Sequence, residues 1–280
     1  MPIRFIALDI DGTLLDGASL LPEANRQAVE AAVGQGIEVA LVTGRRFDFA
    51  LPIAQQMACP LTMIVNNGAL VKSKDGATHL RKLLHRETAL AVLQRTQEFR
   101  DGAAVVFDRA SANQVIYERI DWDDPRRRAY FLRNREYIAQ ISPLEDSLSE
   151  DPIQVMFTGQ IDAMRQAERS LQRAPERADF ALAVTYYADR DFGMVDVIRP
   201  NCSKGATLAE WTAGRGFSRE DVMAIGDNFN DREMLEFAGL PVVMGNGVPE
   251  LKLLGWRETL SNDDDGVAAA ITEYALGSTC

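Results

Sequence analysis

An apolar run near the N-terminus ends in two carboxylates on alternate residues, and this stretch constrains the fold most strongly. The run over residues 3–8 leads into Asp9-Ile10-Asp11-Gly12-Thr13. So apolar a strand is typical of a parallel sheet that is covered on both faces. Residues two apart in a strand face the same way, and ligands of such sheets bind beyond the carboxyl ends of the strands. We therefore expect Asp9 and Asp11 to lie where chemistry occurs, with Gly12 allowing a sharp turn behind them.

Strands and helices alternate in the first 80 residues and again after residue 204. The pattern predicts strands ending near Leu8, Val42 and Val65, and helices from Glu23 to Gly34 and up to Met57. Asp75-Gly76 predicts a hairpin, an antiparallel departure from this rhythm. The later part predicts helices at 205–214 and from 265, with strands at 222–225 and 240–244. Such alternation is typical of an α/β fold with a parallel central sheet.

The middle of the chain follows a different pattern. Strands are expected in pairs, at 104–108 with 114–118 and at 186–189 with 194–198, and a helix is expected at 162–173. Runs of strands without strict alternation are typical of α+β domains. We therefore predict a core formed by residues 1–84 and 200–280, and an inserted domain formed by residues 85–199.

Composition excludes several classes of protein. The 41 acidic residues outnumber the 30 basic ones and give a formal net charge of -11, which disfavours binding to nucleic acid. No stretch has the apolar length of a membrane span. The three cysteines, Cys59, Cys202 and Cys280, form no CxxC pair, so neither a disulfide framework nor a zinc cluster is indicated. The N-terminal residues lack the features of a secretory signal, so we expect a cytoplasmic protein. We also expect a monomer or homodimer, with no nucleic-acid or membrane partner.

Four polar clusters follow predicted strands or begin predicted helices, and together they indicate a phosphate and Mg²⁺ site. The clusters are Asp9 with Asp11, Thr43 with Gly44, Lys204, and Asp227 with Asn230 and Asp231. Mg²⁺ prefers hard oxygen ligands, which we expect from Asp9, the backbone carbonyl of Asp11, and Asp227. Unit charges 4 Å apart interact by about 4 kcal/mol at an effective dielectric constant of 20, so the clustered carboxylates need a cation.

The same residues suggest a covalent mechanism. Asp9 can act as the nucleophile and form an aspartyl phosphate, while Asp11 protonates the leaving alkoxide and later deprotonates water. Thr43, the backbone N–H of Gly44, Lys204 and Asn230 offer donors or positive charge to phosphate oxygens.

At this point the chain closely resembles the haloacid dehalogenase-like hydrolase superfamily, and within it the Cof-type phosphatases. The resemblance rests on four motifs, the first beginning at Asp9, and on accessory stretches. The other motifs are Val42-Thr43-Gly44-Arg45, Ser203-Lys204-Gly205 and Gly226-Asp227-Asn228-Phe229-Asn230-Asp231, and the accessory stretches are Asn66-Asn67-Gly68-Ala69, Met244-Gly245-Asn246 and Asp265-Gly266-Val267.

The resemblance implies a Rossmann-like core whose first strand lies centrally, plus an inserted α+β cap domain that closes over the core and sets specificity. It assigns Asp9 and Asp11 to catalysis and, with Asp227, to the metal. It also assigns Asp231 to orienting the metal shell. The residues that it implies for holding phosphate are Ile10, Thr43, Gly44, Lys204 and Asn230.

The leading hypothesis is a Mg²⁺-dependent phosphatase that hydrolyses small phosphorylated metabolites, with sugar phosphates as the first candidates. Phosphoryl transfer to an acceptor sugar, as in mutases of the same superfamily, is a close alternative. A third hypothesis is a non-catalytic sensor of a phosphorylated metabolite, because a fold does not guarantee activity. A dinucleotide-dependent dehydrogenase is disfavoured, since no GxGxxG follows the first strand.

Overall fold

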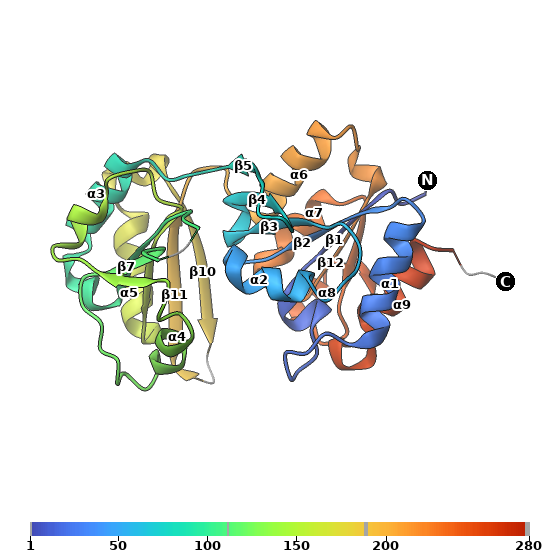
Figure 1. Ribbon diagram of the computed structural model, residues 1–280, viewed down its shortest axis with the longest axis horizontal. Coiled ribbons are helices and arrows are strands. Elements are labelled where there is room, and N and C mark those ends of the chain that lie inside the picture. Colours follow the sequence, from blue (N-terminus) through green and yellow to red (C-terminus); the bar gives the residue numbers. More distant parts are fainter. Residues whose placement is uncertain (1, 111, 188–189, 278–280) are drawn as a thin grey trace. The chain divides into compact units, whose positions relative to one another are not determined.

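The computed structural model describes residues 2–110, 112–187 and 190–277 (Figure 1). Two compact units divide the chain: one contains the segments up to Arg81 and from Cys202 onward, and the other is Lys82–Asn201. The sequence placed these boundaries at 84/85 and 199/200. The role of the second unit as a cap stays a prediction.

The first unit is built on an eight-stranded sheet (Figure 1). The strands from β14 to β3 run parallel, whereas β4 and β5 are antiparallel additions at one edge. The hairpin expected at Asp75-Gly76 joins these two and is confirmed. In spatial order the strands are β14 (Arg257–Glu258), β13 (Leu240–Val243), β12 (Val222–Gly226), β1 (Phe5–Leu8), β2 (Glu38–Val42), β3 (Thr62–Val65), β4 (Leu70–Ser73) and β5 (Thr78–Arg81).

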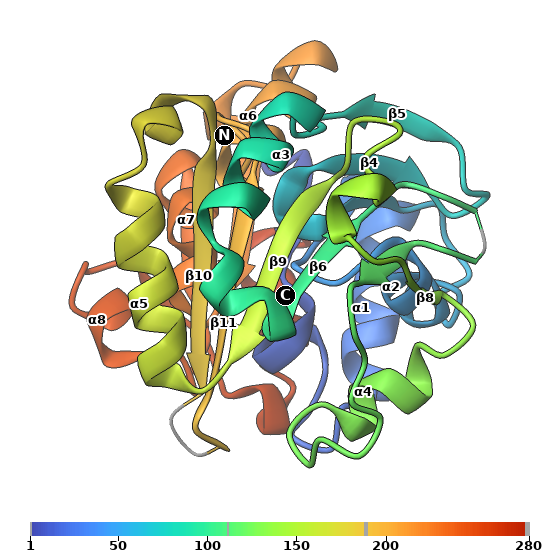
Figure 2. The same ribbon diagram turned by 90° about the vertical axis from the view of Figure 1, so that its left-hand side faces the viewer.

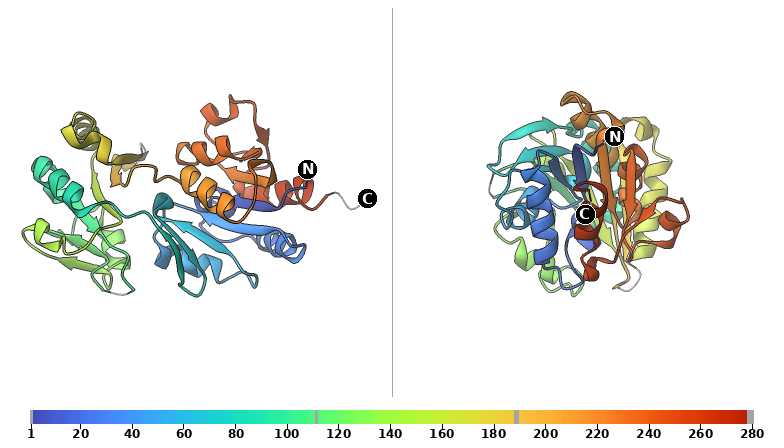
Figure 3. Two further views of the ribbon diagram at one scale, coloured as in Figure 1. Left: turned by 90° about the horizontal axis from the view of Figure 1, so that it is seen from above. Right: turned by 90° about the vertical axis from the view of Figure 1, so that its right-hand side faces the viewer.

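Helices cover both faces of this sheet. Phe5 and Ala7 share a buried cluster with Leu208 of α6 and Met234 of α7, so these two helices pack on one face. Helices α1 and α9 lie side by side on the opposite face (Figure 3), where the Asn25 side chain accepts a hydrogen bond from the N–H of Ala268. The helices of this unit are α1 (Glu23–Gly34), α2 (Phe47–Ala54), α6 (Lys204–Gly214), α7 (Arg232–Phe237), α8 (Pro249–Lys252) and α9 (Gly266–Tyr274).

Strand β1 occupies the centre of the sheet, as the resemblance implied. Phe5 pairs with Val222 of β12 on one side and with Glu38 of β2 on the other. All four residues of β1 are buried, which explains why the strand is continuously apolar. Because β1, β2 and β12 are parallel, their carboxyl ends meet at one edge, and the α/β core with a parallel central sheet is confirmed.

The second unit contains a six-stranded sheet whose strands are antiparallel except for the parallel pair β7 and β8. Helices α3 and α5 cover one face (Figure 2), burying Val155 and Phe157 of β9. In spatial order the strands are β10 (Ala181–Tyr187), β11 (Phe192–Ile198), β9 (Gln154–Gly159), β6 (Ala103–Val106), β7 (Val115–Tyr117) and β8 (Ile138–Gln140), and the helices are α3 (Arg86–Arg95), α4 (Arg128–Arg133) and α5 (Ile161–Gln172).

Both strand pairs expected in the middle segment are present. β6 pairs antiparallel with β7, and β10 pairs antiparallel with β11. Residues 188 and 189, which the sequence placed in the second pair, lie outside the described residues, as does Cys280. No helix of the described part of the chain is long and apolar enough to cross a membrane.

Candidate active site

Asp9 lies directly beyond the central strand and is 4% exposed. Its backbone N–H donates to the carbonyl of Ile225 at 3.1 Å, so the pairing with β12 extends as far as Asp9. The chain then turns through Gly12, whose φ is +80°. A Cβ at this position would lie 2.5 Å from Oδ2 of Asp227, so the close approach of the two segments needs glycine.

Lys204 joins two of the predicted carboxylates in a buried ion-pair network. Its Nζ donates to Oδ1 of Asp9 and to Oδ1 of Asp231, both at 2.6 Å. Lys204 begins α6, and the hydroxyl of Ser203 caps that helix by accepting from the N–H of Ala206 at 3.0 Å. Burial by itself lowers the pKa of Lys204, but the charges of Asp231 and Asp9 more than offset this effect and raise it. The ammonium therefore stays charged.

Asp231 connects the loop after β12 to the ion pairs of Lys204. Its Oδ2 accepts from the backbone N–H groups of Asp227 and Asn228, both at 3.1 Å. A Cβ on Gly226 would lie 2.6 Å from the Cβ of Asp231, so glycine is needed here for the loop to close. Asp231 is fully buried, and its two oxygens hold Lys204 and the loop at once.

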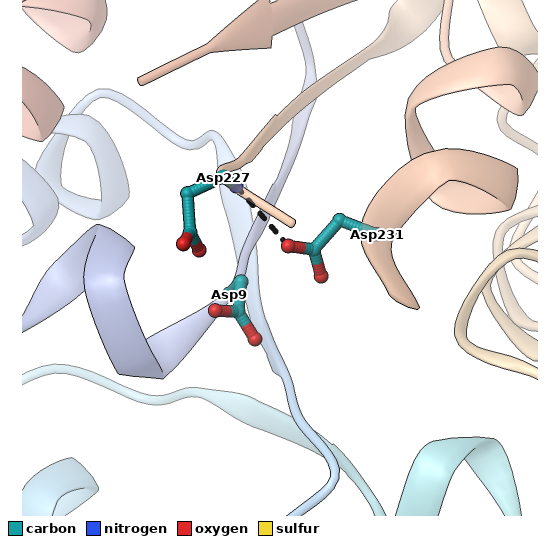
Figure 4. A group of neighbouring side chains, drawn as sticks. All are labelled: Asp9, Asp227 and Asp231. Carbon is teal, nitrogen blue, oxygen red and sulfur yellow. Dashed lines mark hydrogen bonds between the residues drawn. The ribbon is translucent and has the colours of Figure 1, made fainter. Parts of the chain in front are cut away.

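Three carboxylates point into one space at this edge (Figure 4). Asp9, Asp227 and Asp231 each offer an oxygen, and these atoms lie within 4.8 Å of one another. Burial, followed by the charge of Asp231, raises the pKa of Asp9 well above its ordinary value, and the same two causes raise the pKa of Asp227 to about 6. The all-oxygen donor set fits Mg²⁺, and a divalent cation would relieve the repulsion that these shifts report.

Asp11 is not one of these three carboxylates and has a different partner. Its side chain is 55% exposed and is held by Arg45, whose Nε and Nη2 donate to the two carboxylate oxygens at 2.7 and 2.5 Å. Arg45 belongs to the motif Val42-Thr43-Gly44-Arg45, but its role could not be predicted, because a pairing between positions so distant in the sequence depends on how two loops meet.

The contacts of two further residues, Thr13 and Asn246, were not predicted either. The hydroxyl of Thr13 donates to Oδ1 of Asp227 at 3.0 Å and fixes that carboxylate. The side-chain amide of Asn246 donates to the carbonyl of Gly12 at 2.8 Å and accepts from the N–H of Asn262 at 2.9 Å, which braces the turn after Asp9. Thr13 lies in the motif that begins at Asp9, and Asn246 lies in the accessory stretch Met244-Gly245-Asn246. Membership of these stretches was the feature of the sequence that could have indicated a role in the site.

The remaining predicted phosphate-binding residues differ in how exposed they are. Thr43 is buried at the end of β2, where its hydroxyl accepts from the N–H of Arg45 at 3.1 Å, while Gly44 beyond it is exposed. Asn230 is exposed in the loop after β12. The side chain of Ile10 is fully buried, so only its backbone N–H could reach a phosphate. Sheet register brings Thr43 to the edge that carries Asp9, whereas the ion pairs directly join Asp9, Lys204 and Asp231.

A parallel sheet with clustered carboxylates and a buried lysine at its carboxyl edge defines a hydrolase-type core. Residues 6–271 match the family of haloacid dehalogenase-like hydrolases, and the chain belongs to that family. It is of the Cof type that the motifs indicated, and it is an enzyme of the phosphatase kind.

Similar proteins span nearly the whole chain. The 5-amino-6-(5-phospho-D-ribitylamino)uracil phosphatase YcsE of Bacillus subtilis is 28% identical, with 98% of this chain and 96% of the relative covered. The pyridoxal phosphate phosphatase YbhA of Escherichia coli is 26% identical, with 99% and 100% covered. The stress response protein YhaX of Bacillus subtilis is also similar, at 28% identity over 98% of this chain and 94% of the relative.

Solved structures share the fold. A haloacid dehalogenase-like hydrolase from Bacillus subtilis superposes with a TM-score of 0.80 at 22% identity, covering 97% of this chain and 99% of the other. Another from Bacteroides thetaiotaomicron gives a TM-score of 0.79 at 22% identity, covering 96% and 98%.

Proposed function

We propose that this protein is a Mg²⁺-dependent phosphatase that hydrolyses phosphate monoesters of small metabolites through an aspartyl phosphate on Asp9. The observation that carries the proposal is the environment of Asp9. This buried carboxylate contacts the Lys204 ammonium at 2.6 Å and shares a space with the oxygens of Asp227 and Asp231. A nucleophile for phosphorus needs such neighbouring positive charge, because a carboxylate and a phosphate dianion otherwise repel each other.

The residues that would hold Mg²⁺ are Asp9, Asp227 and the backbone carbonyl of Asp11, with Asp231 orienting the set. When bound, the cation neutralises charge on the phosphate oxygens and on the carboxylates. Lys204, the Thr43 hydroxyl, the Gly44 and Ile10 N–H groups and the Asn230 amide would hold the remaining phosphate oxygens. Lys204 is held in place by Asp9 and Asp231, and a donor that is fixed before the reaction costs little to orient at the transition state.

Two displacements complete the reaction. In the first, a carboxylate oxygen of Asp9 bonds to phosphorus while the ester bond breaks, and the Asp11 carboxyl group gives its proton to the leaving alkoxide. In the second, the Asp11 carboxylate takes a proton from water, whose oxygen attacks phosphorus. Inorganic phosphate leaves, and the Asp9 carboxylate is restored.

Two of the similar phosphatases support the proposed substrate class. YcsE is named for its action on 5-amino-6-(5-phospho-D-ribitylamino)uracil and YbhA for its action on pyridoxal phosphate, and both compounds are small phosphate monoesters. We propose the same class here, beginning with sugar phosphates, with residues 85–199 as the cap that sets specificity.

The test is phosphate release from a panel of such monoesters, with Mg²⁺ and with EDTA. We expect turnover only with Mg²⁺, and we expect Asp9→Asn to abolish it while unfolding stays cooperative. Continued hydrolysis by folded Asp9→Asn would exclude the covalent route. Transfer of phosphate to an added acceptor sugar would favour a phosphotransferase, and no release from any ester would favour a sensor.

A further inference from the structure

A strained turn follows β3 at the same edge of the sheet. Asn66, Asn67 and Gly68 all have left-handed backbone conformations, with φ of 52°, 53° and 96°. Asparagine tolerates this region better than other residues that carry a Cβ, but consecutive left-handed residues persist only where the surroundings enforce them. Such strain concentrates at functional sites, and the turn belongs to the accessory stretch Asn66-Asn67-Gly68-Ala69, which has no role in the mechanism proposed above.

One side of the turn holds the loop of Thr43, Gly44 and Arg45. The N–H of Asn66 donates to the carbonyl of Arg45 at 2.9 Å, and the N–H of Asn67 donates to the carbonyl of Thr43 at 3.1 Å. These two carbonyls lie on either side of Gly44. A Cβ on Gly44 would lie 2.9 Å from Oδ1 of Asn67, so the asparagine side chain packs against the loop as well.

The other side of the turn holds the start of α6. The hydroxyl of Thr207 donates to the carbonyl of Gly68 at 2.8 Å, and both residues are buried. A Cβ on Gly68 would lie 2.3 Å from the carbonyl oxygen of Ser203, the residue before Lys204. The turn therefore presses directly on the helix end that carries the lysine.

We propose that Thr207 is a positioning residue, which acts through the Asn66–Gly68 turn to set the placement of Thr43 and Gly44 relative to Lys204. This inference rests on the proposed function, because it takes both groups to hold the same phosphate. Neither Thr207 nor Gly68 needs to touch substrate. Their hydrogen bond fixes the spacing of two sets of phosphate donors, and a misplacement of about 1 Å can cost about a hundredfold in rate.

The chain offers a matched control on the same helix. Thr212 is also fully buried on α6, and its hydroxyl donates to the carbonyl of Leu208 at 2.8 Å, within its own helix. Thr207→Val and Thr212→Val each replace a buried hydroxyl by a methyl group, but only the first cuts the link to Gly68. Thr207→Ser keeps the link and tests rescue.

The readouts are kcat and KM for p-nitrophenyl phosphate, inhibition by inorganic phosphate and orthovanadate, and the vanadate-induced rise in Tm, all with Mg²⁺. We expect Thr207→Val to lower kcat about tenfold with little change in KM. Vanadate, which mimics the five-coordinate transition state, should lose about the same factor in affinity, and phosphate should lose less. Thr212→Val and Thr207→Ser should stay within about twofold of the parent.

Equal effects of the two valine variants, or an unchanged vanadate affinity in Thr207→Val, would overturn the inference. The Tm measurement separates it from the proposed function. If the parent hydrolyses nothing but vanadate raises its Tm less in Thr207→Val alone, the hydrolysis proposal fails and the positioning role stands. If the parent binds no oxyanion at all, both fail.

Discussion

Arg45 holds Asp11 through both of its carboxylate oxygens, with Nε···Oδ2 and Nη2···Oδ1 distances of 2.7 and 2.5 Å. A bidentate fork fixes the direction of a carboxylate as well as its place, which a single contact to lysine would not do. The proposed acid and base is thus oriented by a residue two positions beyond Thr43, at the end of the neighbouring strand.

Replacing Arg45 should therefore impair catalysis more than binding. We expect Arg45→Gln to lower kcat about tenfold, because Asp11 loses the fork that orients its proton transfer. Arg215→Gln is the matched control, since Arg215 forms a similar fork on Glu38 at 2.7 Å for both contacts, on the surface of the same unit. Steady-state kinetics of both variants provide the check, and equal kcat values would contradict the role.

The second prediction concerns Lys204, whose ammonium group pairs with two buried carboxylates, Asp9 and Asp231. Lys204→Met leaves Asp9 and Asp231 without their counter-charge, which we expect to destabilise the metal-free protein by about 3 kcal/mol at pH 8. Phosphatase activity should fall more than a hundredfold with Mg²⁺ present. Urea unfolding and turnover measure the two effects. Unchanged unfolding would mean that the ion pairs contribute little to stability.

Strands β1, β2 and β12 could be predicted because each is an apolar run that ends in a polar cluster, and parallel pairing brings these clusters to one edge. The apolar run before Asp9 and the polar residues after Val42 and Gly226 can be recognised in the sequence without knowing how the loops fold. The short elements β8, β14 and α8 gave no periodic signal, since each spans four residues or fewer.

Contacts between loops could not be predicted from the sequence. The hydrogen bond from Thr207 to Gly68 and the fork from Arg45 to Asp11 join positions whose proximity depends on turn geometry. Hydrophobic periodicity places helices and strands, but it carries no information about which polar side chain in one loop reaches another. The roles of the predicted site residues accordingly stay predictions until variants are measured.

Binding of Mg²⁺ should be visible as stabilisation that grows with pH. Burial and the charge of Asp231 raise the pKa of Asp9 and, to about 6, that of Asp227, so protons occupy these groups at low pH and compete with the cation. At a Mg²⁺ concentration a hundredfold above the Kd at pH 8, the cation should add about 2.7 kcal/mol at pH 8, and the same concentration should add clearly less at pH 5, where Kd is higher.

Asp227→Asn should abolish most of this gain, because it removes one ligand of the proposed set. Asp123→Asn, at an exposed position outside the cluster, should leave the gain unchanged. Thermal unfolding with and without Mg²⁺ measures the effect. An equal gain at both pH values, or in the Asp227→Asn variant, would argue against a carboxylate site here.

Asp196 provides a separate prediction in the second unit. This carboxyl group is buried on β11, and its Oδ1 accepts from Nε2 of Gln154 at 2.8 Å. Burial raises the pKa of Asp196 to about 7 from an ordinary value of 3.8. Oε1 of Gln154 is buried without a hydrogen-bond partner, and a protonated Asp196 would be the donor that such an acceptor requires.

Because the folded pKa exceeds the unfolded one, the folded state binds more protons between pH 4 and 7, so the ionisation of Asp196 lowers stability as pH rises through this window. We expect Asp196→Asn, which stays neutral, to stabilise the protein relative to the parent at pH 8 by up to about 4 kcal/mol, and to give no such gain at pH 4. Urea unfolding of both proteins at the two pH values tests this. A stability difference that does not change with pH would show that Asp196 is not the group that titrates in this range.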